Sequence, residues 1–196
     1  MWFGKALYRV IDCILNALPK LGPTFLNKVD LADAYMLILV LLEDTPSVAL
    51  LVPKATPDEE HLAVFHFSIP MGYVYSADFF CATTKTVKDR ALDTLSKRHT
   101  APPHHLKNLA ETKPPETTAK EIAATLVADK YWEALSPHAR ATTLARIEVY
   151  LDDFISITQG GETERRQMTR HLFHAVDQLF WPNNKDDIVR KDPISP

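Results

Sequence analysis

Val149-Tyr150-Leu151-Asp152-Asp153-Phe154-Ile155 carries the strongest signal in the chain, because two adjacent acids stand between two short apolar runs. The runs 146–149 and 154–157 are typical of strands, so this stretch predicts a hairpin with carboxylates at its turn. Neighbouring side chains of a strand point in opposite directions, so one carboxylate can face a groove while the other braces it or shares a metal ion. Acids are also common in turns, and a solvated Asp-Asp turn is the alternative for this stretch taken alone.

A second acidic segment, Lys28-Val29-Asp30-Leu31-Ala32-Asp33-Ala34-Tyr35, lies far away in the sequence. Asp30 ends a predicted strand over 25–31, where a buried carboxylate is costly unless it binds something. Asp33 is better explained as a helix-cap residue. Together with Asp152 and Asp153, Asp30 could hold two divalent metal ions about 3.5–4 Å apart, an arrangement that serves in-line phosphoryl transfer. Magnesium prefers such oxygen ligands.

A third segment over 67–80 contains Pro70-Met71-Gly72 just before a predicted helix. Gly72 would let the backbone approach a ligand closely. The N-terminus of the following helix would favour phosphate. An ordinary turn between a strand and a helix is the alternative.

The remaining pattern predicts a mixture of helices and strands. Helices are expected over 5–17, 77–95, 119–135, 137–144 and 162–180. Strands are expected over 36–42 (buried on both faces), 47–52 and 61–69, with a hairpin loop at 53–60. Residues 96–118 are polar and rich in proline, and we expect them to run over the surface. In helix 162–180, Leu172, Val176, Leu179 and Phe180 should face inward, and Arg165, Arg166 and Arg170 outward.

Composition favours a single globular domain, since 46% of the 196 residues are hydrophobic and 24% charged. The net charge of −3 means that any phosphate contacts need locally clustered cations. The longest apolar run, 34–42, is too short for a bilayer, and residues 1–15 lack the apolar run of a signal peptide. Cys13 and Cys81 fit no metal-ligand spacing, so we expect reduced thiols in an intracellular protein, cytoplasmic or nuclear. His104 and His105 lack further metal ligands at useful spacing.

The order of the three acidic and turn segments resembles the motifs of reverse transcriptases. The matching stretches are Asp30-Leu31-Ala32-Asp33-Ala34-Tyr35, then Ile69-Pro70-Met71-Gly72-Tyr73-Val74-Tyr75-Ser76, then Tyr150-Leu151-Asp152-Asp153. The resemblance covers roughly residues 26–180 and is closer to retroelements of the long-terminal-repeat type than to others. It implies an α+β fold, with a polymerase palm-like antiparallel sheet of three or four strands and helices on one face. Residues 1–25 would be a remnant of the fingers, 26–181 the palm with a polar insertion near 96–118, and 182–196 a polar tail.

The resemblance also implies an RNA-directed DNA polymerase and its site residues. Asp30, Asp152 and Asp153 match the catalytic aspartates that bind two Mg²⁺ or Mn²⁺ ions. Tyr35 matches the residue that excludes a ribose 2′-hydroxyl. The implied partners are a primed RNA or DNA template and deoxynucleotide triphosphates, with no membrane. Pro70, Met71 and Gly72 match the segment that lies along the template and the incoming nucleotide. Tyr150 matches the tyrosine of the last motif, which we also count among the substrate-binding residues.

The sequence departs from the family pattern at several points. Tyr75 and Ala77 replace the expected polar residue and proline. Beyond the remnant at 1–25, we expect most of the fingers, and all of the thumb and ribonuclease H of a parent polyprotein, to be missing. Two alternatives therefore stay open, namely an inactive relic and a protein-interaction domain with a solvated acidic hairpin. In an interaction domain, Asp30 would lie far from Asp152 or point away from it.

Overall fold

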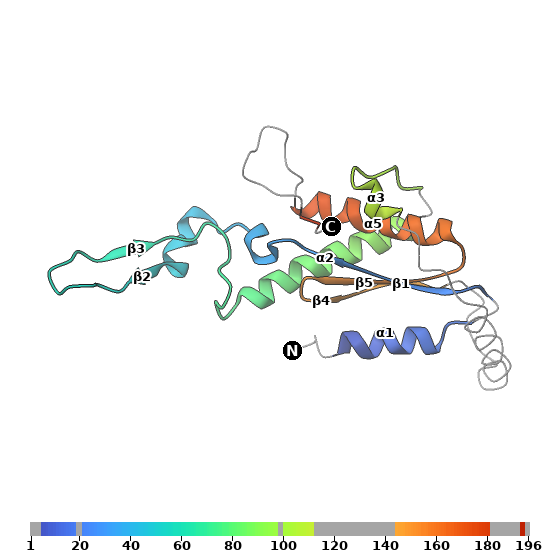
Figure 1. Cartoon of the computed structure of the whole chain (residues 1–196), viewed down its shortest axis with the longest axis horizontal. Coiled ribbons are helices and arrows are strands. Elements are labelled where there is room, and N and C mark those ends of the chain that lie inside the picture. The colour runs from blue at the N-terminus through green and yellow to red at the C-terminus, as the bar shows by residue number, and fades with distance from the viewer. Residues whose placement is uncertain (1–4, 19–20, 98–99, 112–143, 181–192, 195–196) are drawn as a thin grey trace.

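The computed structural model describes residues 5–18, 21–97, 100–111, 144–180 and 193–194, and it has an α+β fold (Figure 1). Its main sheet has three antiparallel strands in the order β1 (Thr24–Asp30), β5 (Asp153–Gln159) and β4 (Ala145–Tyr150). The predicted strand 25–31 and the predicted hairpin around the Asp-Asp pair are confirmed. β5 lies in the middle, so both of its edges are hydrogen-bonded.

Helices cover both faces of this sheet, so the expectation of helices on one face is wrong. α2 (Ser76–Ser96) and α5 (Glu162–Phe180) lie on one side and α1 (Ala6–Leu15) on the other (Figure 1). Alternation along β5 explains the two layers, because Phe154 faces the α2–α5 side and Ile157 faces α1. The larger core is made by apolar side chains that include Val29, Phe80, Ile147, Phe154, Leu172 and Val176.

α1 is attached to the sheet by a small apolar contact and an ion-pair network. Val10 and Cys13 pack against Ile157. Glu148 of β4 is buried, and it accepts hydrogen bonds from Arg9 Nε of α1 at 2.8 Å and from Lys88 Nζ of α2 at 3.0 Å. One carboxylate therefore joins the two helices that flank β4.

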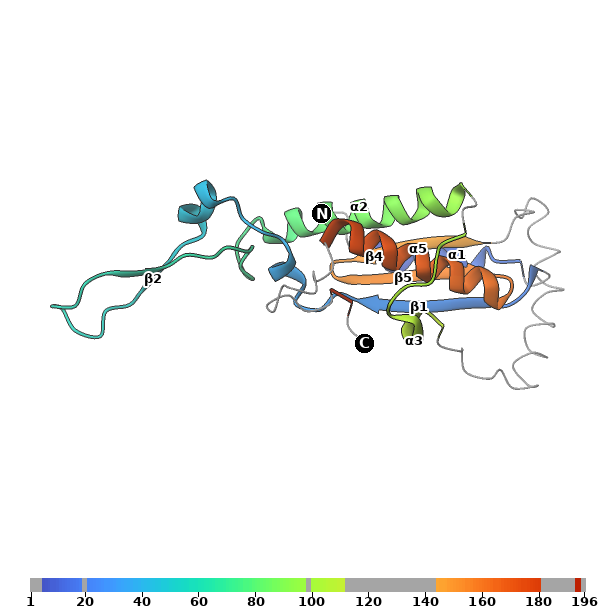
Figure 2. The same ribbon diagram turned by 90° about the horizontal axis from the view of Figure 1, so that it is seen from above.

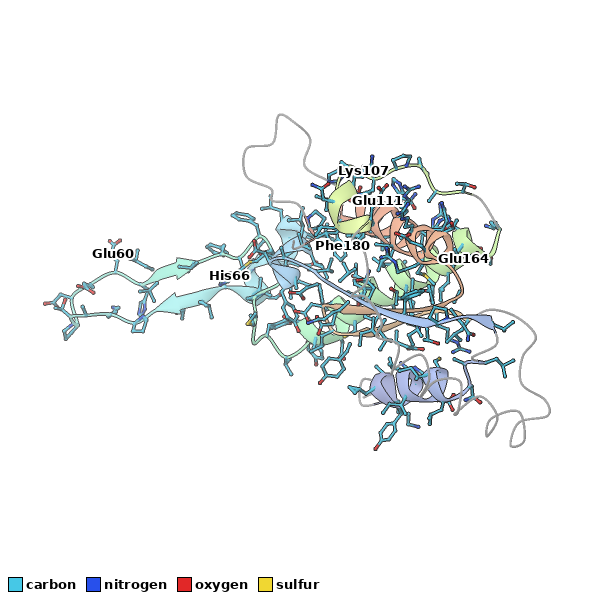
Figure 3. All side chains as sticks on the ribbon, turned by 45° about the vertical axis from the view of Figure 1, so that its right-hand side comes forward. Glu60, His66, Lys107, Glu111, Glu164 and Phe180 are labelled. Carbon is cyan, nitrogen blue, oxygen red and sulfur yellow. The ribbon has the colours of Figure 1, made fainter. Side chains whose placement is uncertain are left out.

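A two-stranded hairpin, β2 (Leu50–Val52) and β3 (Leu62–Val64), projects away from this body (Figures 1 and 2). We call residues 50–64 the arm. Figure 3 shows Glu60 on the outer part of the arm, near its tip, and Phe180 in the body. The predicted hairpin loop at 53–60 is confirmed, although both strands are shorter than expected, and the side chains of β2 and β3 are exposed.

The predicted buried strand over 36–42 is wrong. This segment contains the 3-10 helix η3 (Ala34–Leu37), one isolated bridge from Leu39 to Ser68, and the start of a second 3-10 helix, η4 (Leu42–Val48). Leu42 is 75% exposed. An apolar run becomes a buried strand only where other elements cover both of its faces. Among the described residues, the bridge to Ser68 is the one strand-like pairing of this segment.

The predicted helices 77–95 and 162–180 are confirmed by α2 and α5. Arg165, however, is buried rather than outward-facing. It precedes Leu172 by two helical turns, so both lie on the same face of α5. Burial also lowers the pKa of its guanidinium group, and its Nη2 lies 3.7 Å from Glu162 Oε1.

Two segments that were expected to be peripheral contribute to the core. Of the predicted surface excursion, residues 100–111 contain α3 (Lys107–Ala110) and bury Ala101 and His104. Ile194 of the predicted polar tail is 2% exposed and bridges to Leu31. The predicted helices 119–135 and 137–144 lie outside the described residues. Within the described part of the chain, every helix is too short or too polar to cross a membrane.

Candidate metal centre

Three acids meet where the strands of the main sheet end. β1 ends at Asp30 and β5 begins at Asp153, and the antiparallel register places these two residues directly opposite each other. Asp152 belongs to the tight turn that joins β4 to β5, where Leu151 has a positive φ of 56°. The structure therefore brings together carboxylates that are more than 120 positions apart in the sequence.

The three carboxylates are close enough to act on one another. One oxygen from each of Asp30, Asp152 and Asp153 lies within 4.8 Å of the other two. The pKa of Asp30 is raised, first by partial loss of solvent, then by a hydrogen bond with Asp153 and by the charges of Asp152 and Asp153. The site thus concentrates negative charge, which a cation would relieve.

Lys28 is a member of this site to which the sequence analysis assigned no role. Its Nζ lies 2.9 Å from Asp153 Oδ1, and this contact raises the pKa of the lysine. Lys28 precedes Asp30 by two residues in β1, so both side chains lie on the same face of the sheet. That spacing is the sequence signal that could have placed Lys28 beside the acids.

The donor set fits a hard divalent cation. All three side chains offer carboxylate oxygens, which Mg²⁺ and Mn²⁺ prefer, and Asp30 is exposed to solvent. Exposed acids also occur together without a metal ion, and here Lys28 already neutralises part of the charge. Geometry and charge thus permit a metal centre.

Both predicted tyrosines lie near the acids. Tyr35 is partly buried with its ring centroid 4.9 Å from that of Phe80. The pKa of the Tyr35 hydroxyl is raised, first by burial and then by its neighbours Cys81 and Asp152, so the hydroxyl lies within electrostatic reach of Asp152. Tyr150 pairs with Asp153 in the sheet and is about half exposed.

Pro70, Met71 and Gly72 form a separate turn before α2. Its hydrogen bonds are local, with Ser76 Oγ donating to Pro70 O at 2.8 Å and the Tyr73 amide to the same oxygen at 3.3 Å. Gly72 has φ +92°, and a Cβ on it would meet nothing within 4 Å, so its backbone is open to approach. Met71 is strongly exposed.

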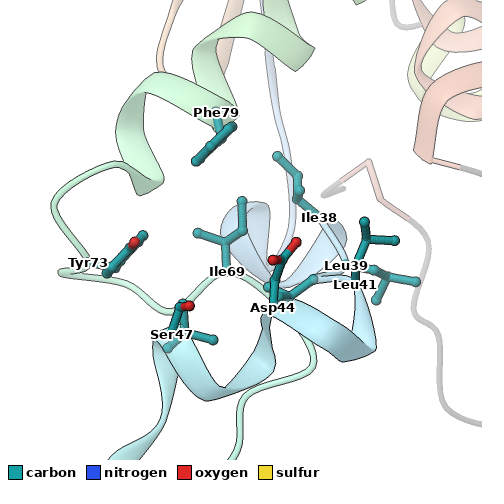
Figure 4. Close-up of a pocket in the computed structure, with 10 residues that line it drawn as sticks. Ile38, Leu39, Leu41, Asp44, Ser47, Ile69, Tyr73 and Phe79 are labelled. Atoms are coloured by element: carbon teal, nitrogen blue, oxygen red, sulfur yellow. The ribbon is translucent and has the colours of Figure 1, made fainter.

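A pocket of about 400 Å³ lies beside this turn (Figure 4). Apolar side chains predominate in its lining, and among the described lining residues Asp44 is the one acid. Tyr73 and Phe79 line it from the α2 side, whereas Ile38 and Leu41 come from the segment after η3 (Figure 4). None of the acids of the metal centre lines this pocket, so we assign it no part in phosphate chemistry.

No protein-family model matches the chain, and no curated protein is significantly similar to it. The grounds for a function are therefore the geometry of Asp30, Asp152 and Asp153 and the motifs that carry them.

Proposed function

We propose that this chain is the palm domain of a retroelement reverse transcriptase, with a site for template-directed DNA synthesis by two-metal nucleotidyl transfer. The observation that carries the proposal is the meeting of Asp30, Asp152 and Asp153 within 4.8 Å at the end of an antiparallel sheet. The three motifs that resemble those of reverse transcriptases occur in the expected order along the chain.

The acids would divide the work according to their surroundings. Asp30 and Asp152 would hold two Mg²⁺ or Mn²⁺ ions, and Asp153, which is paired with Lys28, would assist. Bound in this way, the ions would activate a primer 3′-hydroxyl and stabilise the leaving pyrophosphate of a deoxynucleotide triphosphate. Burial and the neighbouring acids raise the pKa of Asp30, and bound metal ions would compensate the negative charge of its carboxylate.

Two further parts of the chain would position the substrates. Tyr35 is supported by Phe80 and lies near Asp152, where a rigid ring could exclude a ribose 2′-hydroxyl. The open backbone at Gly72 would allow the template or the incoming nucleotide to pass close to the Pro70-Met71-Gly72 turn. Positioning of this kind supplies much of the rate in phosphoryl transfer.

A primer-extension assay with Mg²⁺ or Mn²⁺ on a primed RNA template tests the proposal. Extension should occur with the unmutated chain and disappear in Asp152→Asn, while Asp58→Asn in the exposed loop of the arm serves as the matched control. Titration with Mn²⁺, followed by electron paramagnetic resonance, provides a second readout. If the chain neither extends primers nor binds Mn²⁺ through Asp152, the proposal is wrong.

The two alternatives left open by the sequence, an interaction domain and an inactive relic, predict different observations. In an interaction domain with a solvated hairpin, Asp30 would lie far from Asp152 or point away from it, so the closeness of the two carboxylates supports a metal site over that alternative. An inactive relic keeps the geometry without the chemistry, so Mn²⁺ binding that needs Asp152 but is not accompanied by primer extension would identify it.

A further inference from the structure

The described part of the 96–118 segment carries a histidine that is tightly held by α5. The His104 side chain is almost completely buried, and its ring makes an edge-on contact with Phe173 at 5.1 Å between centroids. The His174 ring lies 5.0 Å away in a similar arrangement. The sequence showed no further ligands near His104, and the fold supplies them from α5, about 70 positions later.

Three potential metal ligands converge here. One ring nitrogen of His104, one of His174 and one carboxylate oxygen of Asp177 all lie within 4.8 Å of one another. His174 and Asp177 are three residues apart, so they lie on the same face of α5. These residues belong to α5 and the 100–106 segment, whereas the acids of the candidate metal centre belong to β1 and the β4–β5 turn.

The hydrogen bonds of the cluster leave one acceptor unsatisfied. Asp177 Oδ2 accepts a hydrogen bond from His104 Nε2 at 2.7 Å. Asp177 Oδ1 is buried, and no hydrogen-bond partner for it is found among the described residues. Buried carboxylate oxygens normally have a partner, because leaving one unpaired has a large desolvation cost. A cation beside Oδ1 would remove that cost.

The two imidazole rings are held in fixed orientations. His174 Nε2 lies 3.0 Å from Pro102 O and donates to it, which leaves Nδ1 of that ring as its lone-pair nitrogen. Metal-binding histidines commonly use one nitrogen for the metal ion and the other to donate to a backbone carbonyl in this way. His104 Nδ1 accepts from the Leu106 amide at 3.2 Å.

We propose that His104, His174 and Asp177 bind a first-row transition-metal ion, preferably Zn²⁺. The bound ion would hold residues 100–106 against α5. Two imidazole nitrogens and one carboxylate oxygen form a ligand set suited to Zn²⁺, with water at a fourth position. For His104 to bind through Nε2, its ring proton moves to Nδ1. The long hydrogen bond from the Leu106 amide then opens, and no redox step is involved.

Calorimetric titration of the metal-free full chain with Zn²⁺ tests this site, in excess Mg²⁺ so that oxygen-only sites are occupied. We expect one equivalent of Zn²⁺ to bind and to raise the melting temperature. Asp177→Asn keeps the shape of the side chain. Asp177→Asn and His174→Gln should each weaken Zn²⁺ binding at least about tenfold, because even residues that only hold a metal ligand in place cost that much when they are replaced. His61→Gln in the arm and Asp89→Asn on α2 change exposed residues and should leave Zn²⁺ binding unchanged.

A second measurement needs no variant and covers the case in which these substitutions unfold the chain. In the NMR spectrum of the histidine ring nitrogens, one equivalent of Zn²⁺ should shift His104 and His174 but not His61. The Leu106 amide signal should shift as its hydrogen bond opens. The proposal is overturned if the unmutated chain binds no stoichiometric Zn²⁺, if these ring signals do not move, or if folded Asp177→Asn and His174→Gln bind as tightly as the unmutated chain.

Discussion

Replacing Glu148 by glutamine should lower the free energy of unfolding by about 3 kcal/mol, the low end for breaking a buried ion pair. The Glu148 side chain is 1% exposed and accepts hydrogen bonds from both Arg9 and Lys88. Glutamine keeps the shape and one neutral acceptor but removes the charge. The Lys88 ammonium group, only 21% exposed, then loses the one counter-ion that it has among the described residues. Hydrogen bonds to charged groups are worth about 1.5–3 kcal/mol each, so most of the loss should come from Lys88.

The same geometry predicts an order among variants. Arg9→Ala should cost no more than about 1 kcal/mol, because the arginine side chain is 39% exposed and solvent screens its ion pair. Urea denaturation followed by circular dichroism measures both values, and an unchanged dependence on urea concentration shows that the same cooperative unit unfolds. Glu60→Gln, near the tip of the arm, is the control and should have no effect. The reasoning is refuted if Glu148→Gln costs less than Arg9→Ala.

Three more predictions concern the acids and the strand that carries one of them. Asp30→Asn should raise the melting temperature at pH 7, because the pKa of Asp30 is raised on folding and the ionised carboxylate therefore opposes folding above that pKa. The gain in melting temperature should vanish in acid, below the pKa of an unfolded aspartate. Lys28→Met should tighten Mn²⁺ binding by up to about fivefold in a fluorescence or resonance titration, because the strength of an exposed ion pair corresponds to a factor of that size. Weaker Mn²⁺ binding would contradict the view that Lys28 competes with the metal ion for Asp153. Ile194→Ala should cost about 2 kcal/mol or more in urea denaturation, since it leaves a cavity beside Leu31; an unchanged midpoint would mean that this segment does not belong to the core.

The elements with strong internal patterns could be predicted from the sequence. The run of apolar positions through Leu172 and Val176 gave the whole of α5, and the acids between apolar runs gave the β4–β5 hairpin. The pairing of Asp30 with Asp153 depends on the register between strands far apart in the sequence. Local patterns carry no information about that register, so the acids at two strand ends suggested a shared metal site without predicting which residues pair.

The failures have one physical cause, which is that burial depends on distant partners. Leu42 lies in the longest apolar run of the chain and is exposed, because none of the described elements covers it. Ile194 stands in a polar stretch and is buried, because it pairs with Leu31 across more than 160 positions. The ligands of the proposed zinc site were missed for the same reason, since His104 and Asp177 become neighbours only in the folded chain.

The pairing of β1 with β5 has a consequence for insertions and deletions. Side chains of a strand alternate between its two faces, so a shift of one residue between Thr24 and Asp30 would turn the Asp30 carboxylate toward α2 and α5. A shift of two residues would return it to the original face, although displaced along the strand. Among descendants of this sequence that keep the acidic cluster, length changes within β1 should therefore be absent or even-numbered, whereas the loop of the arm can gain or lose single residues freely.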